Sequence, residues 1–287
     1  MNSPSSIKTY YGMTEADLLA FETVYRPDLL KGKVVLVSGG GTGIGQAIAV
    51  LCGRLGAQVV ICGRKQENLD ATRAIFDKIG AGCDAFAMTI REPDQVSALM
   101  DTVWEKHGRL DLLVNNAGGQ FPQDAIDYSP KGWNAVIDTN LTGSFNMMQA
   151  AAKRWRDRGQ PGSIVNILAA YMRGMAQIAH TSAARAGVAN LCLSLGLEWA
   201  PFNIRVNAVA PGTIETVGLN VYPEEARATF TNRCPLRRLG TVMEIAEAVV
   251  YIGGPSGSFI TGETLVIDGG QYMWGHAWPF KEPEYFR

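Results

Sequence analysis

The sequence predicts an α/β protein with a Rossmann-type, doubly wound parallel sheet of about seven strands flanked by helices. Short apolar runs alternate with helical patterns through most of the chain, as expected when parallel strands are joined by right-handed helical crossovers. A glycine-rich turn, Ser38–Gly45, follows the first apolar run directly. The 287 residues, of which 47% are hydrophobic, are enough to bury one large core.

The first predicted strand is the apolar run Val34–Ser38. It does not alternate between apolar and polar residues, which indicates a strand covered on both faces. The same reasoning predicts further strands at Gln58–Cys62, Asp84–Thr89, Leu110–Asn115, Ser163–Leu168, Ile204–Val209 and Thr264–Asp268.

Helical patterns fill the stretches between these strands. The glycine-rich turn opens the first of them, and Pro93 suits the first turn of another. The buried stripe of that second helix is predicted to be Val96, Leu99, Met100, Val103 and Trp104. Thr241–Glu244 matches a capping box ahead of an apolar helix. A short helical pattern, Glu15–Tyr25, lies near the N-terminus.

No linker to a second domain is found in the sequence. Residues 1–30 are predicted to form an N-terminal extension, residues 31–272 a single Rossmann-type domain, and residues 273–287 a C-terminal tail. The tail and the preceding Tyr272 are rich in aromatic residues. Such enrichment favours a contact between subunits over a cofactor site.

Composition narrows the classes of partner and location. The net charge is −1 and no basic cluster occurs, so neither a nucleic acid nor a membrane surface is an expected partner. No apolar run approaches the roughly 20 residues that cross a bilayer, and the N-terminus lacks the apolar segment of a secretory signal. A cytoplasmic location is therefore expected. The three histidines and five scattered cysteines lack metal-ligand spacing, so no metal site is expected.

The glycine-rich turn has the features of a dinucleotide-binding site. Its first glycine permits a tight turn, its fourth lets the backbone approach a pyrophosphate, and its last allows close helix packing. The helix that follows would present free N–H groups to the phosphates. A purely structural turn is the alternative, but the preceding strand and following helix favour binding. The predicted contacts are Gly39, Gly41, Thr42, Gly43, Ile44 and Gly45.

The end of the second strand indicates which dinucleotide is bound. A site for NAD usually places Asp or Glu there to hold the ribose hydroxyls. This chain has Cys62 and Gly63 followed by Arg64 and Lys65. Two cations and no acid favour a 2′-phosphate, and hence NADP as the cofactor. A solvated basic turn is the alternative.

Five motifs together resemble the short-chain dehydrogenase/reductase family. They are Ser38–Gly45, Asn115–Gly118, Asn140, Pro211–Thr213 and Asp268–Gly270. The resemblance spans roughly residues 30–272 and is far more specific than any single motif. It implies a single Rossmann-type domain, a nicotinamide cofactor, a small-molecule substrate and a homotetramer or homodimer.

The resemblance also implies roles for particular residues. The segment Asn116, Ala117 and Gly118 would line the adenine side of the cofactor. Asn140 would order a water near the reaction centre. The nicotinamide would be flanked by Pro211, Gly212 and Thr213.

The chain departs from the family at its usual catalytic residues. The expected Ser, Tyr and Lys fall by spacing at Leu168, Thr181 and Arg185. Four residues are about one helical turn, so Thr181 and Arg185 share a helix face. A threonine hydroxyl is a much poorer acid than a phenol. Arginine stays protonated, but it can hold ribose hydroxyls and supply charge.

This departure resembles the peroxisomal trans-2-enoyl-CoA reductases. The segments that carry the resemblance are Asn115–Phe121, Lys131–Trp133, Thr139–Gly143, Ala183–Val188 and Ser258–Gly262. The related 2,4-dienoyl-CoA reductases also lack tyrosine at position 181. They use a tyrosine soon after the fifth strand, which Tyr171 approximately matches. The tyrosine assigned to catalysis in the enoyl-CoA reductases falls at Ala189.

The sequence thus predicts an NADPH-dependent reductase of an activated carbon–carbon double bond, with an acyl-CoA thioester as the expected substrate. Such a reaction needs a donor to the enolate oxygen, and Tyr171, Thr181 and Asn140 are the candidates. Arg185 is predicted to bind the cofactor. The alternatives are an NADP-dependent carbonyl reductase with an unusual acid and a catalytically silent NADP-binding protein.

The segment Val217–Cys234 lacks a strand pattern and is predicted to cover the substrate. Within it, Asn220, Tyr222 and Phe230 are expected to shape the pocket. Elsewhere, His180 is either a substrate contact or an ordinary loop histidine.

Overall fold

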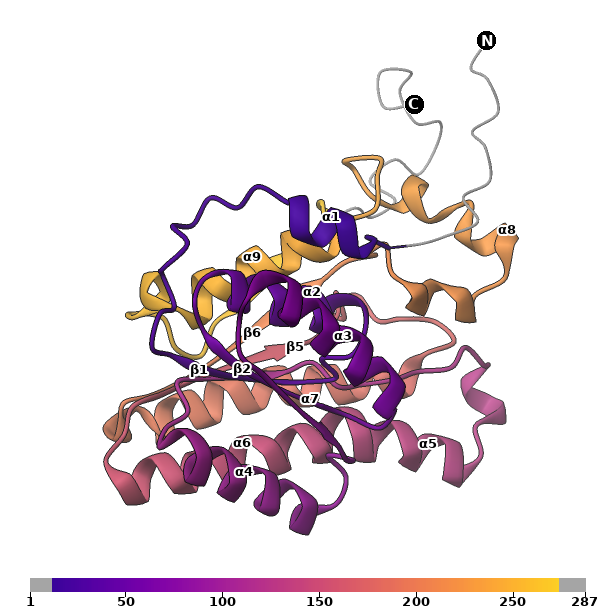
Figure 1. The fold of residues 1–287 in the computed structure, drawn as a ribbon. Coiled ribbons are helices and arrows are strands. Elements are labelled where there is room, and N and C mark those ends of the chain that lie inside the picture. The colour runs from indigo at the N-terminus through magenta and orange to yellow at the C-terminus, as the bar shows by residue number, and fades with distance from the viewer. Residues whose placement is uncertain (1–11, 274–287) are drawn as a thin grey trace.

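The computed structural model describes residues 12–273. At its centre lies a sheet of seven parallel strands in the order β3-β2-β1-β4-β5-β6-β7, which confirms the predicted architecture (Figure 1). The strands are β1 Val34–Ser38, β2 Gln58–Gly63, β3 Cys83–Ala87, β4 Leu112–Asn115, β5 Gly162–Ile167, β6 Ile204–Pro211 and β7 Thr264–Ile267. After β3 the chain returns to the other side of β1 to form β4. The strand order therefore switches between β1 and β4, where such sheets bind ligands.

Three strands are shorter than the sequence predicted: β7 ends one residue early, and β3 and β4 each differ by two residues at one end. β3 ends at Ala87 and not at Thr89, whose backbone N–H donates to Gln95 Oε1 at 3.0 Å. β4 begins at Leu112 and not at Leu110, whose carbonyl accepts the indole N–H of Trp155 at 2.7 Å. In both cases a side chain takes the place of a neighbouring strand as hydrogen-bond partner.

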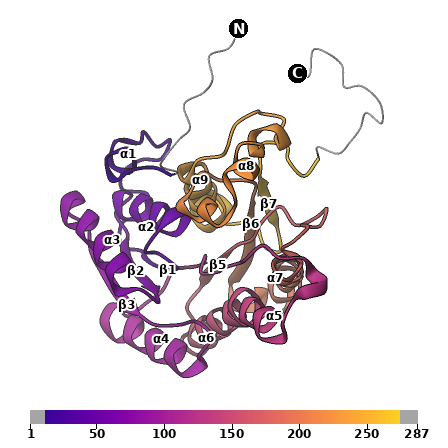
Figure 2. The same ribbon diagram turned by 90° about the vertical axis from the view of Figure 1, so that its right-hand side faces the viewer.

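Helices cover both faces of the sheet. In Figure 2, α2, α3 and α9 lie over one face and α4, α6 and α7 over the other. The helices are α1 Glu15–Ala20, α2 Gly43–Arg54, α3 Gln66–Ile79, α4 Pro93–His107, α5 Pro130–Ile137, α6 Gly143–Arg158, α7 Ala179–Glu198, α8 Glu224–Arg227 and α9 Val242–Gly253. The capping box of α9 is formed as predicted, because Glu244 N donates to Thr241 Oγ1 and Thr241 N to Glu244 Oε2.

Each face of the sheet has its own hydrophobic core. The side chains of β1 alternate between them, with Val35 and Val37 in the core under α2 and α9 and Val34 and Leu36 in the core under α4 and α6. All five residues of β1 are buried. β1 is thus a run of apolar residues without alternation because both of its faces are covered, as the sequence indicated.

The described part of the N-terminal extension packs onto the first of these cores. α1 buries Leu18, and Arg54 of α2 donates to the carbonyls of Leu18 and Phe21. α1 ends at Ala20, earlier than the predicted helical pattern to Tyr25, and Tyr25 reaches across to the carbonyl of Glu247 on α9 at 3.0 Å. Side-chain contacts with the domain here outweigh the local helical tendency.

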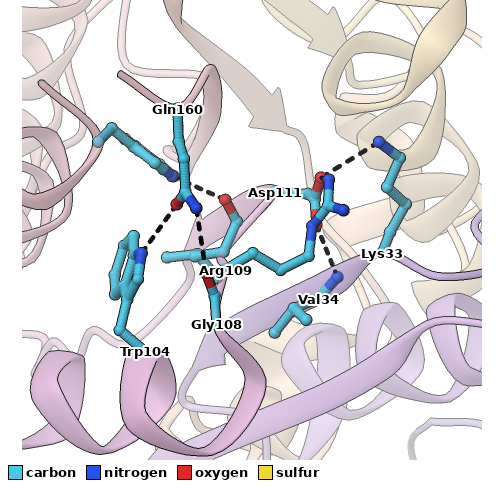
Figure 3. A network of polar contacts seen from close by, with 9 residues as sticks. Lys33, Val34, Trp104, Gly108, Arg109, Asp111 and Gln160 are labelled. Carbon is cyan, nitrogen blue, oxygen red and sulfur yellow. Dashed lines mark hydrogen bonds and ion pairs between the residues drawn. The ribbon is translucent and has the colours of Figure 1, made fainter. Parts of the chain in front are cut away.

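A polar network joins the strands at the edge away from the carboxyl ends (Figure 3). The carboxylate of Asp111 accepts from Lys33 Nζ, Val34 N and Arg109 Nε at 2.8–3.2 Å. Nearby, Gln160 accepts from the Trp104 indole at 2.9 Å. These bonds fix the loops at the amino ends of the strands, opposite the carboxyl ends where such sheets bind ligands.

None of the helices formed by residues 12–273 has the length and hydropathy needed to span a bilayer. Residues 1–11 of the predicted extension and residues 274–287 of the predicted tail lie outside the described residues.

Candidate active site

The glycine-rich turn lies at the carboxyl end of β1. Gly39 has φ +67°, and a Cβ at Gly45 would lie 2.3 Å from the Gly39 carbonyl oxygen. Side chains at these two positions are therefore excluded by backbone conformation and by space. α2 begins at Gly43, and its N-cap residue Thr42 makes no side-chain hydrogen bond to the helix. The first N–H groups of α2 thus remain available for an anion.

Asn116, which directly follows β4, binds the glycine-rich turn at the end of the adjacent strand β1. Its side-chain Nδ2 donates to the carbonyls of Ser38 and Gly39, both at 3.1 Å. Ser38 Oγ in turn accepts from the backbone N–H groups of Asn116 and Ala117, both at 3.1 Å. The structure thus brings together the first two motifs from which the sequence predicted a cofactor site.

A cleft of about 300 Å³ opens beside the turn. Arg64 and Lys65 line it, and so do Ala117, Gly118 and, from the turn, Gly39, Gly41 and Thr42. Within residues 12–273 no Asp or Glu lines this cleft. A third cation, Arg91, also lines it, and its guanidinium donates to Thr139 Oγ1 and the Ala135 carbonyl.

A second cavity, of about 720 Å³, continues from the turn toward β6. It is lined by Asn140, Leu168, Thr181 and Arg185 and by Pro211–Thr213. Ile44 of the turn lines it as well. This second cavity therefore joins the predicted nicotinamide-flanking residues to Thr181 and Arg185.

Arg185 is the most unusual group in the second cavity. Only 8% of the residue is exposed, and it makes no hydrogen bond or ion pair with any described residue. Burial lowers the pKa of its guanidinium to about 10, so it is charged at neutral pH. A Cβ at Gly118 would lie 2.3 Å from Arg185 Nη2. The absence of a side chain at Gly118 thus makes room for a buried cation without a counter-ion.

Asn140 lies on a stretch of π-helix, Asp138–Thr142, between α5 and α6. Such insertions are frequent at functional sites. Asn140 is fully buried, and its amide bonds both backbone groups of Gly119: Oδ1 accepts from N and Nδ2 donates to O, each at 2.9 Å. The side chain is therefore committed to positioning the loop after β4.

Thr181 lies in the first turn of α7 and contacts His180. Its backbone N–H donates to His180 Nδ1 at 2.7 Å, and its Oγ1 lies 3.3 Å from the same atom. The His180 ring is fully buried, stacked on Tyr128 at a 4.6 Å centroid distance. Burial lowers the pKa of His180, which favours the neutral ring. These contacts indicate that His180 supports the start of α7.

The structure does not place Tyr171 among the residues that line either cleft. Its half-buried ring packs against the core under α4 and α6. Burial raises the pKa of its phenol, and nearby Cys192 raises it further. The role of Tyr171 as a donor stays a prediction.

The segment Val217–Cys234 lies over the second cavity, as the sequence led us to expect. It forms a 3-10 turn at Val217–Val221, then α8, then another 3-10 turn at Phe230–Arg233. Tyr222 and Phe230 line the cavity, and their rings meet edge to face at 5.4 Å. Asn220 does not line it.

Gln120 and Gln271 are two of the lining residues that the sequence did not single out. Gln120 donates from Nε2 to the Tyr222 hydroxyl at 2.6 Å. Gln271 Oε1 accepts from Thr213 N at 3.0 Å and from Thr213 Oγ1 at 3.1 Å, and so orients the segment at the predicted nicotinamide end. Gln120 belongs to the segment Asn115–Phe121 noted above, and this was the only indication in the sequence that it contributes to the site.

The fold and the turn define a Rossmann-type dinucleotide-binding protein. Residues 39–271 match the family model described as enoyl-(acyl carrier protein) reductase. The chain belongs to the short-chain dehydrogenase/reductase family and is an oxidoreductase. Enzymes of this family use a nicotinamide cofactor.

Named relatives match over most of the chain. A probable 2,4-dienoyl-CoA reductase of Bacillus subtilis is 38% identical, over 88% of this chain and 100% of its own. A peroxisomal 2,4-dienoyl-CoA reductase of Pongo abelii is 38% identical over 89% of both chains. The structure of a short-chain type dehydrogenase/reductase from Mycobacterium marinum superposes with a TM-score of 0.82 at 30% identity, covering 90% of this chain and 99% of that one.

Proposed function

We propose that the chain is an NADPH-dependent reductase of an activated carbon–carbon double bond, with an enoyl-CoA-like thioester as substrate. The observation that carries the proposal is the unpaired guanidinium of Arg185 in a cavity that has Thr181 in place of a phenol. Reduction of a ketone needs an acid at the oxygen of the carbon that accepts the hydride. Reduction of an enoyl thioester needs instead a stabiliser for charge on a more distant oxygen. The names of the relatives support this choice.

The residues of the first cleft fit NADP. Close packing at Gly39 and Gly45 shapes the turn, and the uncapped N-terminus of α2 beside it suits a pyrophosphate. Arg64 and Lys65 would hold the 2′-phosphate, and no carboxylate among residues 12–273 lines the cleft to oppose it. Arg185 would hold the ribose hydroxyls next to the nicotinamide. Asn116 and Pro211–Thr213 would flank the cofactor on either side.

The reaction follows from these placements. When bound, the reduced nicotinamide supplies a hydride to the β carbon of the alkene. Negative charge then develops on the thioester carbonyl oxygen and must meet hydrogen-bond donors of this chain. A proton at the α carbon completes the saturated thioester. Tyr171 and water are the two candidate sources of that proton, and water is favoured because Tyr171 is not among the residues that line the cavity.

We also propose a homotetramer or homodimer. Leu193 and Leu197 of α7 are exposed by 54% and 80%, and Phe259 is fully exposed. Exposed apolar side chains on neighbouring surfaces favour contact with another subunit. Light scattering of the purified protein tests this, and a monomeric mass would contradict it.

The test of the proposed function is a screen of NADPH oxidation with enoyl-CoA thioesters, ketones and quinones. Loss of the alkene in the thioester product, seen by mass spectrometry, is the expected result. Turnover of ketones alone would support the carbonyl reductase instead. Tight NADPH binding without turnover of any of them would support a catalytically silent binding protein.

A further inference from the structure

Three consecutive residues, Gly118–Gln120, lie against three polar side chains at one wall of the 720 Å³ cavity. At the first residue, a Cβ would lie 2.3 Å from Arg185 Nη2. At the second, both backbone groups bond the amide of Asn140. At the third, the side-chain Nε2 donates to the hydroxyl of Tyr222 at 2.6 Å. Since adjacent Cα atoms are about 3.8 Å apart, these contacts lie along one short stretch of backbone.

The Tyr222 hydroxyl is an available donor. A phenol both donates and accepts, and here its oxygen accepts from Gln120. Its own proton is therefore free to point toward a ligand. The ring is held from the other side by Phe230. Burial raises the pKa of Tyr222, against a smaller lowering by the bond from Gln120, so the phenol keeps its proton at neutral pH.

The other polar groups of this wall are already engaged. Both polar atoms of the Asn140 side chain bond Gly119. Thr181 Oγ1 lies next to His180 Nδ1. Arg185 is free of protein partners, but the proposed function assigns it to the cofactor. Among the described residues that line this cavity, Tyr222 thus carries the phenol.

We infer that Tyr222 is a catalytic residue whose Oη–H donates a hydrogen bond to the thioester carbonyl oxygen of the substrate. The inference rests on the proposed function and names a residue for it. As the hydride and its two electrons pass from the reduced nicotinamide to the β carbon, the alkene π pair moves onto the α carbon and carbonyl oxygen. Tyr222 stabilises this enolate, and a proton from water closes the reaction at the α carbon.

Steady-state kinetics of the full chain with a trans-2-enoyl-CoA and NADPH test the inference in Tyr222→Phe. Loss of one oxyanion donor typically costs about 10²–10³ in rate, so we expect kcat to fall by that factor. The KM for the thioester and the Kd for NADPH, measured by fluorescence titration, should stay unchanged. Tyr251→Phe, at an exposed position of α9, is the matched control and should behave like the parent.

Gln120→Met distinguishes two roles for Tyr222: a hydrogen-bond donor to the substrate, or a purely structural partner that holds the segment Val217–Cys234 in place. This variant removes the bond to Tyr222 and keeps the phenol. A donor role predicts a much smaller loss of kcat than in Tyr222→Phe. Equal effects of both substitutions, with a raised KM, would overturn the inference in favour of a structural bond.

The two proposals fail in different ways. A parent protein that reduces the enoyl thioester, together with a fully active Tyr222→Phe, overturns the inference alone. A parent that reduces only ketones overturns the proposed function and this inference with it. So does a parent that reduces nothing.

Discussion

Arg185 is a residue whose position costs stability. Moving a charged group out of water is unfavourable unless an opposite charge or hydrogen bonds compensate. Arg185 is nearly buried and finds neither among residues 12–273. Proteins tolerate such groups where a ligand supplies the missing partner. The residue is thus better explained by what it binds than by the packing of α7.

Replacing Arg185 by Met should show that the buried charge lowers the stability of the free protein but contributes to cofactor binding. The variant keeps the length and packing of the side chain and removes the charge. We expect the free energy of unfolding of the free protein to rise by about 1 kcal/mol or more, while the affinity for NADPH falls. Thermal unfolding and cofactor titration measure the two effects. A variant that binds NADPH normally but loses turnover would show that Arg185 acts on the substrate.

Arg64 is expected to set the choice between the two nicotinamide dinucleotides. A charge-assisted contact with phosphate contributes about 1.5–3 kcal/mol, so Arg64→Ala should weaken NADPH by roughly ten-fold or more and leave NADH unchanged. Titration of both dinucleotides measures this. Arg26→Ala, at a distant exposed cation, serves as the control. An equal loss for both dinucleotides would argue against the 2′-phosphate contact.

At the scale of elements, the site is built where several ends meet. The turn after β1, the loop after β4, the π-helix before α6 and the first turn of α7 each contribute polar groups. The bonds of Asn140 tie the π-helix to the loop after β4. Rigid elements thus fix one wall, while the segment Val217–Cys234 covers the other.

The loop after β5 and the start of α7 offer rival donors, and their substitutions distinguish them. Tyr171 packs against the core under α4 and α6 and is not among the residues that line the cavity, whereas Thr181 lines it. If the sequence-based assignment is correct, Tyr171→Phe lowers kcat more than Thr181→Val does. The structure favours the reverse order, with a loss below the 10²–10³ typical of a sole donor. Full activity of both variants would leave Tyr222 and water as the remaining candidate donors.

At the scale of the whole molecule, the sheet was predictable and the wall of the cavity was not. Most strands are apolar runs that the local sequence displays, and the predicted ends of all seven strands agree with the observed ends within two residues. The glycine-rich turn was equally visible, since close packing leaves room for glycine alone at Gly45. By contrast, Gln120 and Tyr222 are 102 positions apart. A hydrogen bond across that separation leaves no periodic pattern. Tyr171 lies in the loop after β5, where no periodic pattern predicts what a side chain contacts.

The extension before β1 should behave as part of the domain and not as a detachable arm. Leu18 is only 2% exposed and belongs to the core under α2 and α9. Removing a buried leucine side chain costs about 2–5 kcal/mol, so Leu18→Ala should lower the free energy of unfolding by that amount. Chemical denaturation, with Val24→Ala at an exposed site of the same segment as control, measures it. If Leu18→Ala and Val24→Ala are equally stable, the packing of Leu18 contributes nothing to the stability of the fold.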